Sequence, residues 1–389
     1  MHVGSQHNQK RHQASLFNSF YQGSFACSTA CRTPGKRADL MLSSGHDTLL
    51  EKDYALLQQH QLLTARDGAR WYLVEKQAGE YNWQSFLPQL EAAEKYHIEM
   101  IWELAHFGWP DWLDIWQPEF VERFAAFARA FACLLRARGQ AAPFISPMNQ
   151  ISFWSWAGAD IAWFNPFVTG RRIELKRQLV AASIAAMRAM REELPGVRFV
   201  ITDPLVHVAA SGYSSSAKQQ ALQQHQAQFE VWDWISGRSA AELGGSEELL
   251  DIIGFTWYPD NEWFHNGDPL EPHHPDYLPL HHLLQQVWQR YQRPLLIAET
   301  GAEIGKCADW FNRVSQEVAL ALEAGVALEG VSIYPLVDYP AWDDDRRSPA
   351  GLFGLPDANG NRTVNEPFAL ALRSQQIKLK QEPVRTSTA

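Results

Sequence analysis

Short apolar runs alternate with long amphipathic segments along almost the whole chain, and this alternation constrains the fold more than any other feature. The apolar runs predict eight β-strands, over residues 19–28, 62–67, 98–106, 143–150, 198–204, 250–258, 294–299 and 328–338. Helical periodicity lies between and after them, over residues 49–60, 84–96, 118–138, 171–193, 278–291, 308–325 and 366–379. Strands that alternate regularly with helices favour a parallel (β/α)₈ TIM barrel over a doubly wound open sheet.

The barrel is predicted to be a single domain, because no linker or shift in composition divides the chain. It is expected to span residues 16–380. The polar, His- and Gln-rich start of the chain predicts a disordered tail over residues 1–15, and a second tail is expected over 381–389. Two long segments, 206–248 and 259–277, are rich in Gly, Ser, Asp and His and predict loops and short helices over the active face.

Charge and composition exclude several classes of function. The formal net charge is −10 and no basic patch with interleaved aromatic residues occurs, so nucleic acid is not an expected partner. No apolar run reaches the roughly 18 residues of a membrane span, and the start of the chain lacks the apolar core of a signal peptide. The cysteines fit neither a disulfide framework nor a zinc site, which favours a reducing cytoplasm; they are Cys27, Cys31, Cys133 and Cys307.

Polar residues end nearly every predicted strand. In parallel barrels the chemistry lies at the C-terminal ends of the strands, so these residues are candidates for a site. They are Arg66, Asp67, His106, Asn149, Gln150, Asp203, Tyr258, Glu299 and Asp338. Any one of them could instead cap the helix that follows, but their recurrence on successive strands favours a shared site.

Glu299 ends the apolar run LLIAE and is expected to project into the mouth of the barrel. A retaining glycosidase uses such a carboxylate as nucleophile, with a second carboxyl group about 5–5.5 Å away as general acid/base. A charged carboxylate there needs cationic or hydrogen-bonding partners, and Arg66 and Tyr258 are the natural suppliers. By position, the second carboxyl group belongs at the end of the strand over 143–150.

Tryptophan is unusually frequent, with 16 in the chain, and several follow predicted strand ends. Indole faces stack on the C–H faces of sugars, so Trp109, Trp257 and Trp342 are candidates for a carbohydrate cleft, although core packing would explain many of the tryptophans equally well. The paired histidines His273–His274 and His281–His282 are interpreted as solvated loop residues, because no carboxylate stands in a ligand register beside them. No metal and no cofactor is expected.

Several motifs resemble those of family 1 glycoside hydrolases, in the wider barrel clan that also holds family 5. The run IAETG at 297–301 resembles the family's nucleophile motif Ile-Thr-Glu-Asn-Gly, and Asn149–Gln150 resembles its Asn-Glu acid/base pair. Arg66, five residues before Trp71, matches the spacing of the family's Arg-x-x-x-x-Trp. His106 in AHFGWP resembles the family's His-Trp-Asp segment, and YPLVDYPAW at 334–342 runs parallel to its Trp-Ser-Leu-Leu-Asp-Asn-Phe-Glu-Trp.

The resemblance implies roles for these residues. Glu299 would be the nucleophile and Arg66 would contact it, while Asn149 and His106 would hold hydroxyls of the sugar. Two departures put the family's usual pyranoside specificity in doubt: Cys31 stands where a sugar-binding glutamine is expected, and Ala341 stands where a sugar-binding glutamate is expected. The identity of the sugar, its linkage and the oligomeric state therefore stay open.

A third departure concerns the chemistry itself, because Gln150 stands where the acid/base glutamate is expected. An amide can neither protonate a leaving group nor activate water, and general acid–base assistance contributes about 10²–10⁴-fold. The sequence therefore predicts a retaining β-glycosidase that works by double displacement on a small glycoside or oligosaccharide, impaired at Gln150. A Glu→Gln knock-out is favoured over a natural change, because the surrounding apparatus is intact.

Two other classes of function compete with this interpretation. If Gln150 is native, the same barrel could be a carbohydrate-binding pseudoenzyme that recognises sugar without cleaving it. A metal-dependent barrel hydrolase is the other alternative, and the lack of clustered His and Asp ligands at the strand ends speaks against it.

Overall fold

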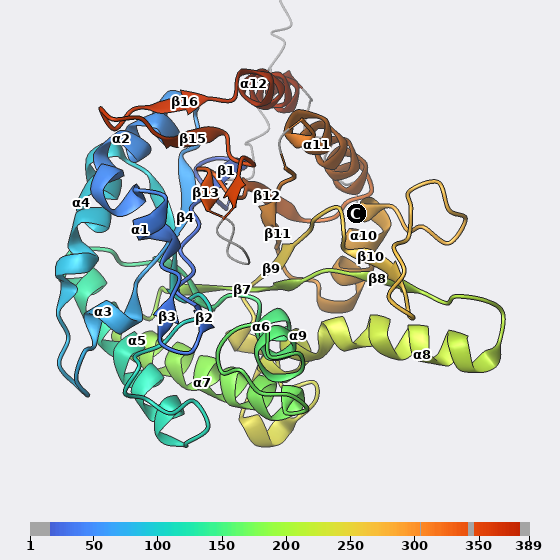
Figure 1. Ribbon diagram of the computed structural model, residues 1–389, viewed down its shortest axis with the longest axis horizontal. Helices are drawn as coiled ribbons and strands as arrows, with labels where there is room; N and C mark the ends of the chain where they lie inside the picture. The colour runs from blue at the N-terminus through green and yellow to red at the C-terminus, as the bar shows by residue number, and fades with distance from the viewer. Residues whose placement is uncertain (1–15, 304, 341–345, 382–389) are drawn as a thin grey trace, which may run out of the picture.

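The computed structural model describes residues 16–303, 305–340 and 346–381, and its centre is a closed parallel barrel (Figure 1). The barrel strands are β1 (Tyr21–Ser24), β4 (Thr64–Gly68), β5 (Glu99–Ala105), β6 (Phe144–Met148), β7 (Arg198–Pro204), β9 (Ile252–Thr256), β11 (Leu295–Thr300) and β12 (Leu328–Ile333). Each strand pairs in parallel with the next along the chain, and β12 closes the ring on β1. All eight lie within the predicted runs or one residue beyond them, so the predicted (β/α)₈ barrel is confirmed.

Long helices surround the barrel (Figure 1). Those predicted from periodicity are α2 (His46–Gln59), α4 (Leu87–Tyr96), α5 (Glu119–Ala137), α7 (Arg172–Glu193), α10 (Leu280–Tyr291), α11 (Cys307–Glu323) and α12 (Glu366–Gln381). Their apolar faces pack against the outer side of the strands; in α5, for example, the buried residues are Phe120, Phe124, Phe127, Ala128, Phe131, Ala132 and Leu135. This spacing of three and four residues is the amphipathic pattern of a helix that covers a sheet.

Shorter elements decorate the strand ends. The additional helices are α1 (Leu40–Ser43), α3 (Trp71–Val74), α6 (Ile151–Ala159), α8 (Ser215–Gln226) and α9 (Glu230–Ile235), with 3₁₀ turns η1 (Trp83–Ser85), η2 (Ala227–Phe229), η3 (Ala241–Leu243) and η4 (Glu247–Leu249). Short strands outside the barrel are β2 (Cys31–Thr33), β3 (Lys36–Arg37), β8 (His207–Ala209), β10 (Glu262–Phe264), β13 (Tyr339–Pro340), β14 (Arg347–Ser348), β15 (Phe353–Pro356) and β16 (Arg362–Val364).

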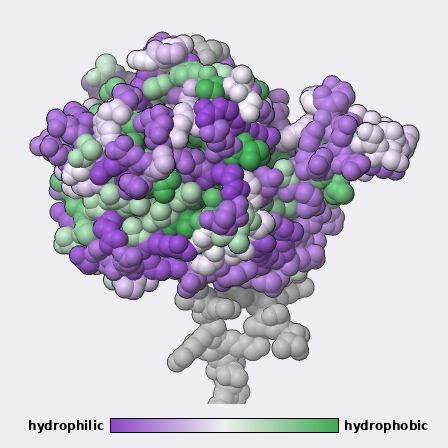
Figure 2. Space-filling model, turned by 90° about the horizontal axis from the view of Figure 1, so that it is seen from below, coloured by the Kyte–Doolittle hydropathy of each residue, from purple (hydrophilic) through white to green (hydrophobic). Residues whose placement is uncertain are grey.

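The two long segments expected to be loops and short helices contain a small substructure of their own. β8 from the first pairs in parallel with β10 from the second, outside the barrel, and α8 stands clear of the barrel beside them (Figure 1). The projection is mostly hydrophilic (Figure 2). Strands of three residues carry too little periodicity to be predicted, which is why this pairing was not expected.

Alternation along the strands separates two environments. Successive side chains on a strand point to opposite faces, so one set fills the barrel and the other meets the helices. On β4, Arg66 reaches across the barrel interior, whereas its neighbour Asp67 bonds to His46 of α2. An apolar layer also fills the barrel; it comprises Phe17, Ile101, Phe144, Val200, Ile252, Leu296 and Ala298.

The predicted tails and one predicted site residue lie outside the described residues. They are 1–15, nearly all of 381–389, and Trp342. Among the helices that the structure describes, none combines the length and apolar character that crossing a membrane requires.

Candidate active site

Glu299 lies near the C-terminal end of β11 and is surrounded by side chains from other strands. Arg66 comes from β4, and Asn149 and Gln150 follow β6 directly. Tyr258 follows β9 by two residues. The parallel arrangement brings these strand ends together, so residues more than 200 positions apart in the chain, such as Arg66 and Glu299, come into contact.

Four donors saturate the carboxylate of Glu299. Its Oε1 accepts from Arg66 Nη1 at 3.1 Å and from Asn149 Nδ2 at 2.9 Å. Its Oε2 accepts from Tyr258 Oη and from Gln150 Nε2, both at 2.8 Å. Only 1% of Glu299 is exposed, so this charge is held almost wholly by protein groups. Donors arranged in this way stabilise the ionised form of a buried carboxyl group.

Two of these donors are fixed in their donating forms. Burial opposes the charge of Arg66, but the carboxylates of Glu103 and Glu299 outweigh it and raise the pKa of Arg66. Burial and the neighbouring charge of Glu299 raise the pKa of Tyr258 well above its ordinary value, so its hydroxyl keeps its proton. Glu299 therefore faces one permanent cation and one phenol at all ordinary pH values.

Gln150 is held in an unusual backbone conformation at the start of α6. Its φ of +48° is in the left-handed region, which a non-glycine residue adopts at a cost of roughly 1 kcal/mol or more. Its N–H donates to Thr202 O at 2.9 Å and its carbonyl accepts from Trp154 N–H at 2.8 Å. This geometry turns the side chain onto Glu299. An amide can donate there without being protonated, which a glutamate could not do.

Glu103 is a second buried carboxylate in the site, and the sequence analysis missed it. It lies on β5, is 2% exposed, and accepts from Arg66 through Oε1 and from His106 Nδ1 at 2.8 Å through Oε2. Burial favours its neutral form, but Arg66 and then His106 outweigh this effect and lower the pKa of Glu103 to about 2. A charged residue in the middle of the run IEMIWELAH was the signal that could have found it.

His106 is held in one tautomer by the same network. Asn149 Oδ1 accepts from Arg66 Nη2 at 3.1 Å, which orients the amide so that Nδ2 faces His106 Nε2 at 3.1 Å. His106 Nε2 is therefore an acceptor and Nδ1 carries the proton that is donated to Glu103. The imidazole is a fixed link between Asn149 and Glu103.

Cys27, Glu103 and His106 are the described residues that come closest to a set of metal ligands. Their ligand atoms lie within 4.8 Å of one another, and all three side chains are buried. However, the Cys27 thiol donates to Glu103 Oε2 at 3.2 Å, and His106 Nδ1 already carries a proton. A metal ligand must present a free lone pair. The cluster therefore fits a set of hydrogen bonds better than a metal site.

Aromatic rings lie over the site at the open end of the barrel. The rings of Tyr258 and His106 each lie 6.5 Å from that of Tyr334, and Tyr339 lies 6.5 Å beyond it. Burial raises the pKa of Tyr334 well above its ordinary value, and the charge of Glu299 adds to this effect. The rings of Tyr258, Tyr334 and Tyr339 therefore form a rim near the Glu299 carboxylate that is mostly apolar but carries hydroxyl groups.

The side chains of three other predicted residues make none of the contacts to the Glu299 carboxylate. Trp109 packs against Trp154 at 5.9 Å and against the core, and donates from Nε1 to Leu113 O. Asp338 accepts from Gly351 N–H at 2.8 Å and thereby holds the segment after β14. Trp257 is 3% exposed and lies on the outer side of the barrel wall.

Asp203 and Cys31 both hold local structure. For Asp203 this is the helix-cap alternative that its position at a strand end left open. Asp203 Oδ1 accepts from Ser152 N–H at 2.8 Å in the first turn of α6, and burial raises the pKa of Asp203 to about 6. It therefore acts as a helix cap. The backbone N–H of Cys31 donates to Asn165 Oδ1 at 2.6 Å, which ties the β2–β3 hairpin to the loop after α6.

Comparison with known proteins shows the fold. No family model matches the sequence, and no curated protein matches it. Among solved structures, the AHE enzyme from Alicyclobacillus herbarius has a TM-score of 0.77 at 17% identity, over 95% of this chain and 100% of its own. The family 1 β-glucosidase from Thermotoga maritima has a TM-score of 0.75 at 14% identity, over 92% and 97%. The virulence factor SghA from Agrobacterium tumefaciens has a TM-score of 0.76 at 16% identity, over 92% and 96%.

These likenesses extend over nearly the full length of each chain. They confirm the barrel architecture, and they include the family whose motifs the sequence resembles. At such low identity they say nothing about which sugar this chain would take.

Proposed function

We propose that the chain is a retaining β-glycosidase scaffold in which Glu299 is the nucleophile. The observation that carries the proposal is the carboxylate of Glu299 at the C-terminal end of a barrel strand, paired with Arg66 and oriented by three neutral donors. A carboxylate held in this way is ready to attack without first losing a proton. The β configuration is taken from the solved β-glucosidase of similar fold.

In the first step one bond forms and one bond breaks. An oxygen of Glu299 bonds to the anomeric carbon of the sugar, and the bond from that carbon to the leaving oxygen breaks, with its electron pair departing on the leaving group. Arg66 and Tyr258 keep the attacking carboxylate in place. In the second step a water oxygen bonds to the same carbon, the bond to Glu299 breaks with its electron pair returning to the carboxylate, and the proton of the water passes to solvent as the sugar is released.

The distance between positions 150 and 299 favours a retaining mechanism over an inverting one. The two side chains approach to 2.8 Å between Gln150 Nε2 and Glu299 Oε2. Inverting enzymes separate the two groups by about 6.5–9.5 Å to accommodate a water molecule, whereas retaining enzymes bring them to about 5–5.5 Å. Side chains in direct contact leave no room for the water molecule that an inverting enzyme places between them.

Gln150 limits what this centre can cleave. It cannot protonate the leaving oxygen, and it cannot activate the water of the second step, so both steps lose general acid–base assistance of about 10²–10⁴-fold. Leaving groups that depart as stable anions, such as nitrophenolates, need no proton. We therefore expect the chain to react with activated aryl glycosides and to be impaired on ordinary ones, as an inactivated variant would be.

A specific observation favours the second candidate, a carbohydrate-binding pseudoenzyme. The Gln150 amide donates directly to the carboxylate of Glu299, and a glutamate at the same place could do so only in its protonated form. Gln150 is thus a complementary partner for Glu299 and fits a native residue as well as a substituted one. In that case the site would bind sugar hydroxyls without forming a covalent bond.

The test is Gln150→Glu, assayed beside the chain as it stands on a panel of nitrophenyl β-glycosides. We expect the glutamate form to gain roughly 10²–10⁴-fold in turnover on at least one sugar. On the same sugar, azide should speed turnover of the Gln150 form only, because this anion attacks the anomeric carbon in place of water and needs no base to activate it. Glu299→Gln is the control and should remove both effects. If neither form releases nitrophenol from any sugar while a glycoside still binds, the pseudoenzyme is correct.

A further inference from the structure

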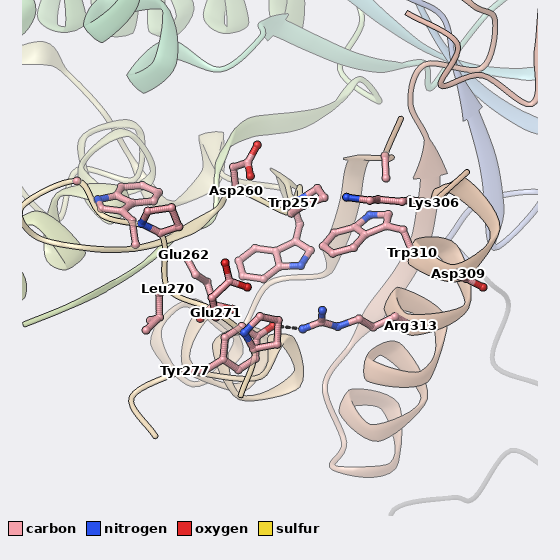
Figure 3. Close-up of a pocket in the computed structure, with 16 residues that line it drawn as sticks. Trp257, Asp260, Glu262, Leu270, Glu271, Tyr277, Lys306, Asp309, Trp310 and Arg313 are labelled. Atoms are coloured by element: carbon pink, nitrogen blue, oxygen red, sulfur yellow. Dashed lines mark hydrogen bonds between the residues drawn. The ribbon is translucent and has the colours of Figure 1, made fainter. Parts of the chain in front are cut away.

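A cavity of about 610 Å³ lies on the outer side of the barrel wall, behind the candidate active site. It is bordered by the loop 259–277 and by the first turns of α11 (Figure 3). Trp257 and Tyr258 are consecutive, as are Thr300 and Glu299. The Tyr258 hydroxyl bonds to the Glu299 carboxylate inside the barrel, whereas Trp257 lines the cavity and Thr300 bonds to Trp310 of α11. The cavity is therefore separate from the space around Glu299.

The hydrogen bonds around Thr300 hold the wall of this cavity in place. The Thr300 hydroxyl donates to Trp257 O at 2.7 Å and accepts from Trp310 Nε1 at 2.9 Å. On the opposite side Arg313 donates to the Tyr277 hydroxyl (Figure 3). These bonds fix the rings of Trp310 and Tyr277 before any ligand arrives, which lowers the entropic cost of binding.

One buried polar atom in the lining has no partner of good geometry. Glu262 is 4% exposed, and its Oε2 accepts from Leu278 N–H at 3.1 Å. No described donor meets its Oε1 in hydrogen-bond geometry, although this atom is buried. Burial raises the pKa of Glu262 to about 7, although the Leu278 amide and the Tyr277 hydroxyl act to lower this pKa. This oxygen therefore belongs to the buried support of the cavity wall, beside Tyr277, and does not face the cavity.

We infer that this cavity is a second binding site for a neutral carbohydrate, independent of Glu299. Its half-buried indoles, Trp263 and Trp310, offer faces for a sugar ring, while the exposed carboxylates of Asp260 and Glu271 offer acceptors for hydroxyls. Its volume lies within the range of about 300–1,000 Å³ for sites of small molecules, and suits one or two sugar units.

Charge in the cavity distinguishes a neutral sugar from other ligands. Above about pH 7, where Glu262 is ionised too, the carboxylates Asp260, Glu262 and Glu271 outnumber the cations Lys306 and Arg313, while Asp309 points away (Figure 3). A phosphorylated sugar would meet this excess of negative charge. An organic cation would compete with Arg313, whose guanidinium already lies 5.7 Å from the ring centre of Trp310 and 5.5 Å from that of Tyr277.

The experiment measures binding to the full chain by ligand-observed NMR titration, so it does not depend on hydrolysis. The probes are glucose, galactose, mannose, xylose, cellobiose and lactose, with glucose 6-phosphate and tetramethylammonium as charged comparisons. At least one neutral sugar should bind more tightly than both charged probes. Trp310→Ala should weaken that sugar on the order of tenfold, because it removes a stacking face. Trp288→Phe, at the far end of α10, is the matched control and should leave binding unchanged.

A variant in the barrel separates the two sites. Asn149→Ala alters the surroundings of Glu299 and should not change binding of that sugar to the outer cavity. If Trp310→Ala fails to fold by circular dichroism, Trp263→Ala takes its place. The inference is overturned if no neutral sugar binds, if Asn149→Ala abolishes binding while Trp310→Ala does not, or if tetramethylammonium binds most tightly. None of these results bears on whether Glu299 is a nucleophile.

Discussion

Arg66 and Asp67 are neighbours on β4, yet they belong to two different buried charge clusters. The inner cluster joins Arg66 to the carboxylates of Glu103 and Glu299 inside the barrel. In the outer cluster Asp67 and Asp53 flank His46, which bonds to them at 3.0 and 2.7 Å, and Arg362 bonds to Asp53. Both clusters are almost fully buried. At most 2% of each residue is exposed, except for Arg362, whose side chain is 1% exposed but whose backbone is more accessible.

The clusters differ in net charge. The outer cluster is balanced, because Asp53 and Asp67 face two cations, Arg362 and a histidine whose pKa its carboxylate neighbours raise to about 9 against the effect of burial. The inner cluster has one cation for two carboxylates, and neutral donors from Asn149, Gln150 and Tyr258 make up the difference. Balanced buried charge holds elements together, whereas an excess negative charge can stabilise the positive charge that develops on a sugar ring in glycoside cleavage.

The largest effect should follow from removing the one cation of the inner cluster. Arg66→Met leaves Glu103 and Glu299 buried without a countercharge, so we expect the free energy of unfolding to fall by about 3–5 kcal/mol. Release of nitrophenol from an aryl glycoside should also be lost, because Glu299 would lose the cation that holds its carboxylate in place. Urea denaturation and a nitrophenol burst assay measure the two effects. Arg66→Lys keeps the charge, so its stability and activity should lie between those of the unchanged chain and of Arg66→Met. A fully stable Arg66→Met would contradict the charge assignment.

The outer cluster should show itself in the dependence of stability on pH. The pKa of His46 rises from 6.5 to about 9 on folding, so its contribution is complete below about pH 6.5 and is lost as the pH rises through about 9. The loss should amount to about 3 kcal/mol in urea denaturation curves taken across this range. His46→Gln should be less stable at pH 6 and should lack this decline. If the stability of His46→Gln declined equally between pH 6.5 and 9, groups other than His46 would cause the decline.

Two tyrosines provide a matched pair for the next effect. Tyr258→Phe removes a donor from Glu299 Oε2, and a hydrogen bond to a charged group contributes about 1.5–3 kcal/mol, so the nitrophenol burst rate should fall roughly 10–100-fold. Tyr54→Phe removes a donor from Asp67 Oδ2 at 3.0 Å in the outer cluster. It should lower stability by a similar free energy and leave the burst rate unchanged. Equal effects of both variants on the burst rate would erase the distinction between the clusters.

The smallest effect is expected at Cys27, which touches the inner cluster through a weak donor. Its thiol donates to Glu103 Oε2 at 3.2 Å, while Arg66 and His106 already bond to the same carboxylate. Cys27→Ala should therefore lower the free energy of unfolding by about 1 kcal/mol and change the burst rate less than twofold. Thermal unfolding followed by circular dichroism measures the first quantity. A loss comparable to that of Arg66→Met would make the thiol a central member of the cluster.

Much of the fold follows from local sequence. Parallel barrel strands are buried on both faces, so they stand out as apolar runs, and the helices between them show a clear helical period. The strand ends then place Arg66, Asn149, Tyr258 and Glu299 on one face without further information. The pairing of β8 with β10 could not be predicted, because it depends on a tertiary contact between two short segments.

Features of the site that could not be predicted from the sequence also depend on tertiary contacts. Glu103 was overlooked because its partners lie on other strands and only the folded barrel reveals them. Trp257 was predicted as a sugar-binding residue from its type and place in the chain. It follows the end of β9, outside the regular strand, and only the folded structure shows that its side chain lines the outer cavity.

The bond between Arg362 and Asp53 joins residues 309 positions apart, near opposite ends of the chain. During synthesis the ribosome releases α2 long before Arg362 emerges, so Asp53 spends most of that time without its final countercharge. Closure of β12 on β1 is also postponed until the last strand is made. The N-terminal strands therefore wait for their last partner, and the ring closes only after β12 has left the ribosome.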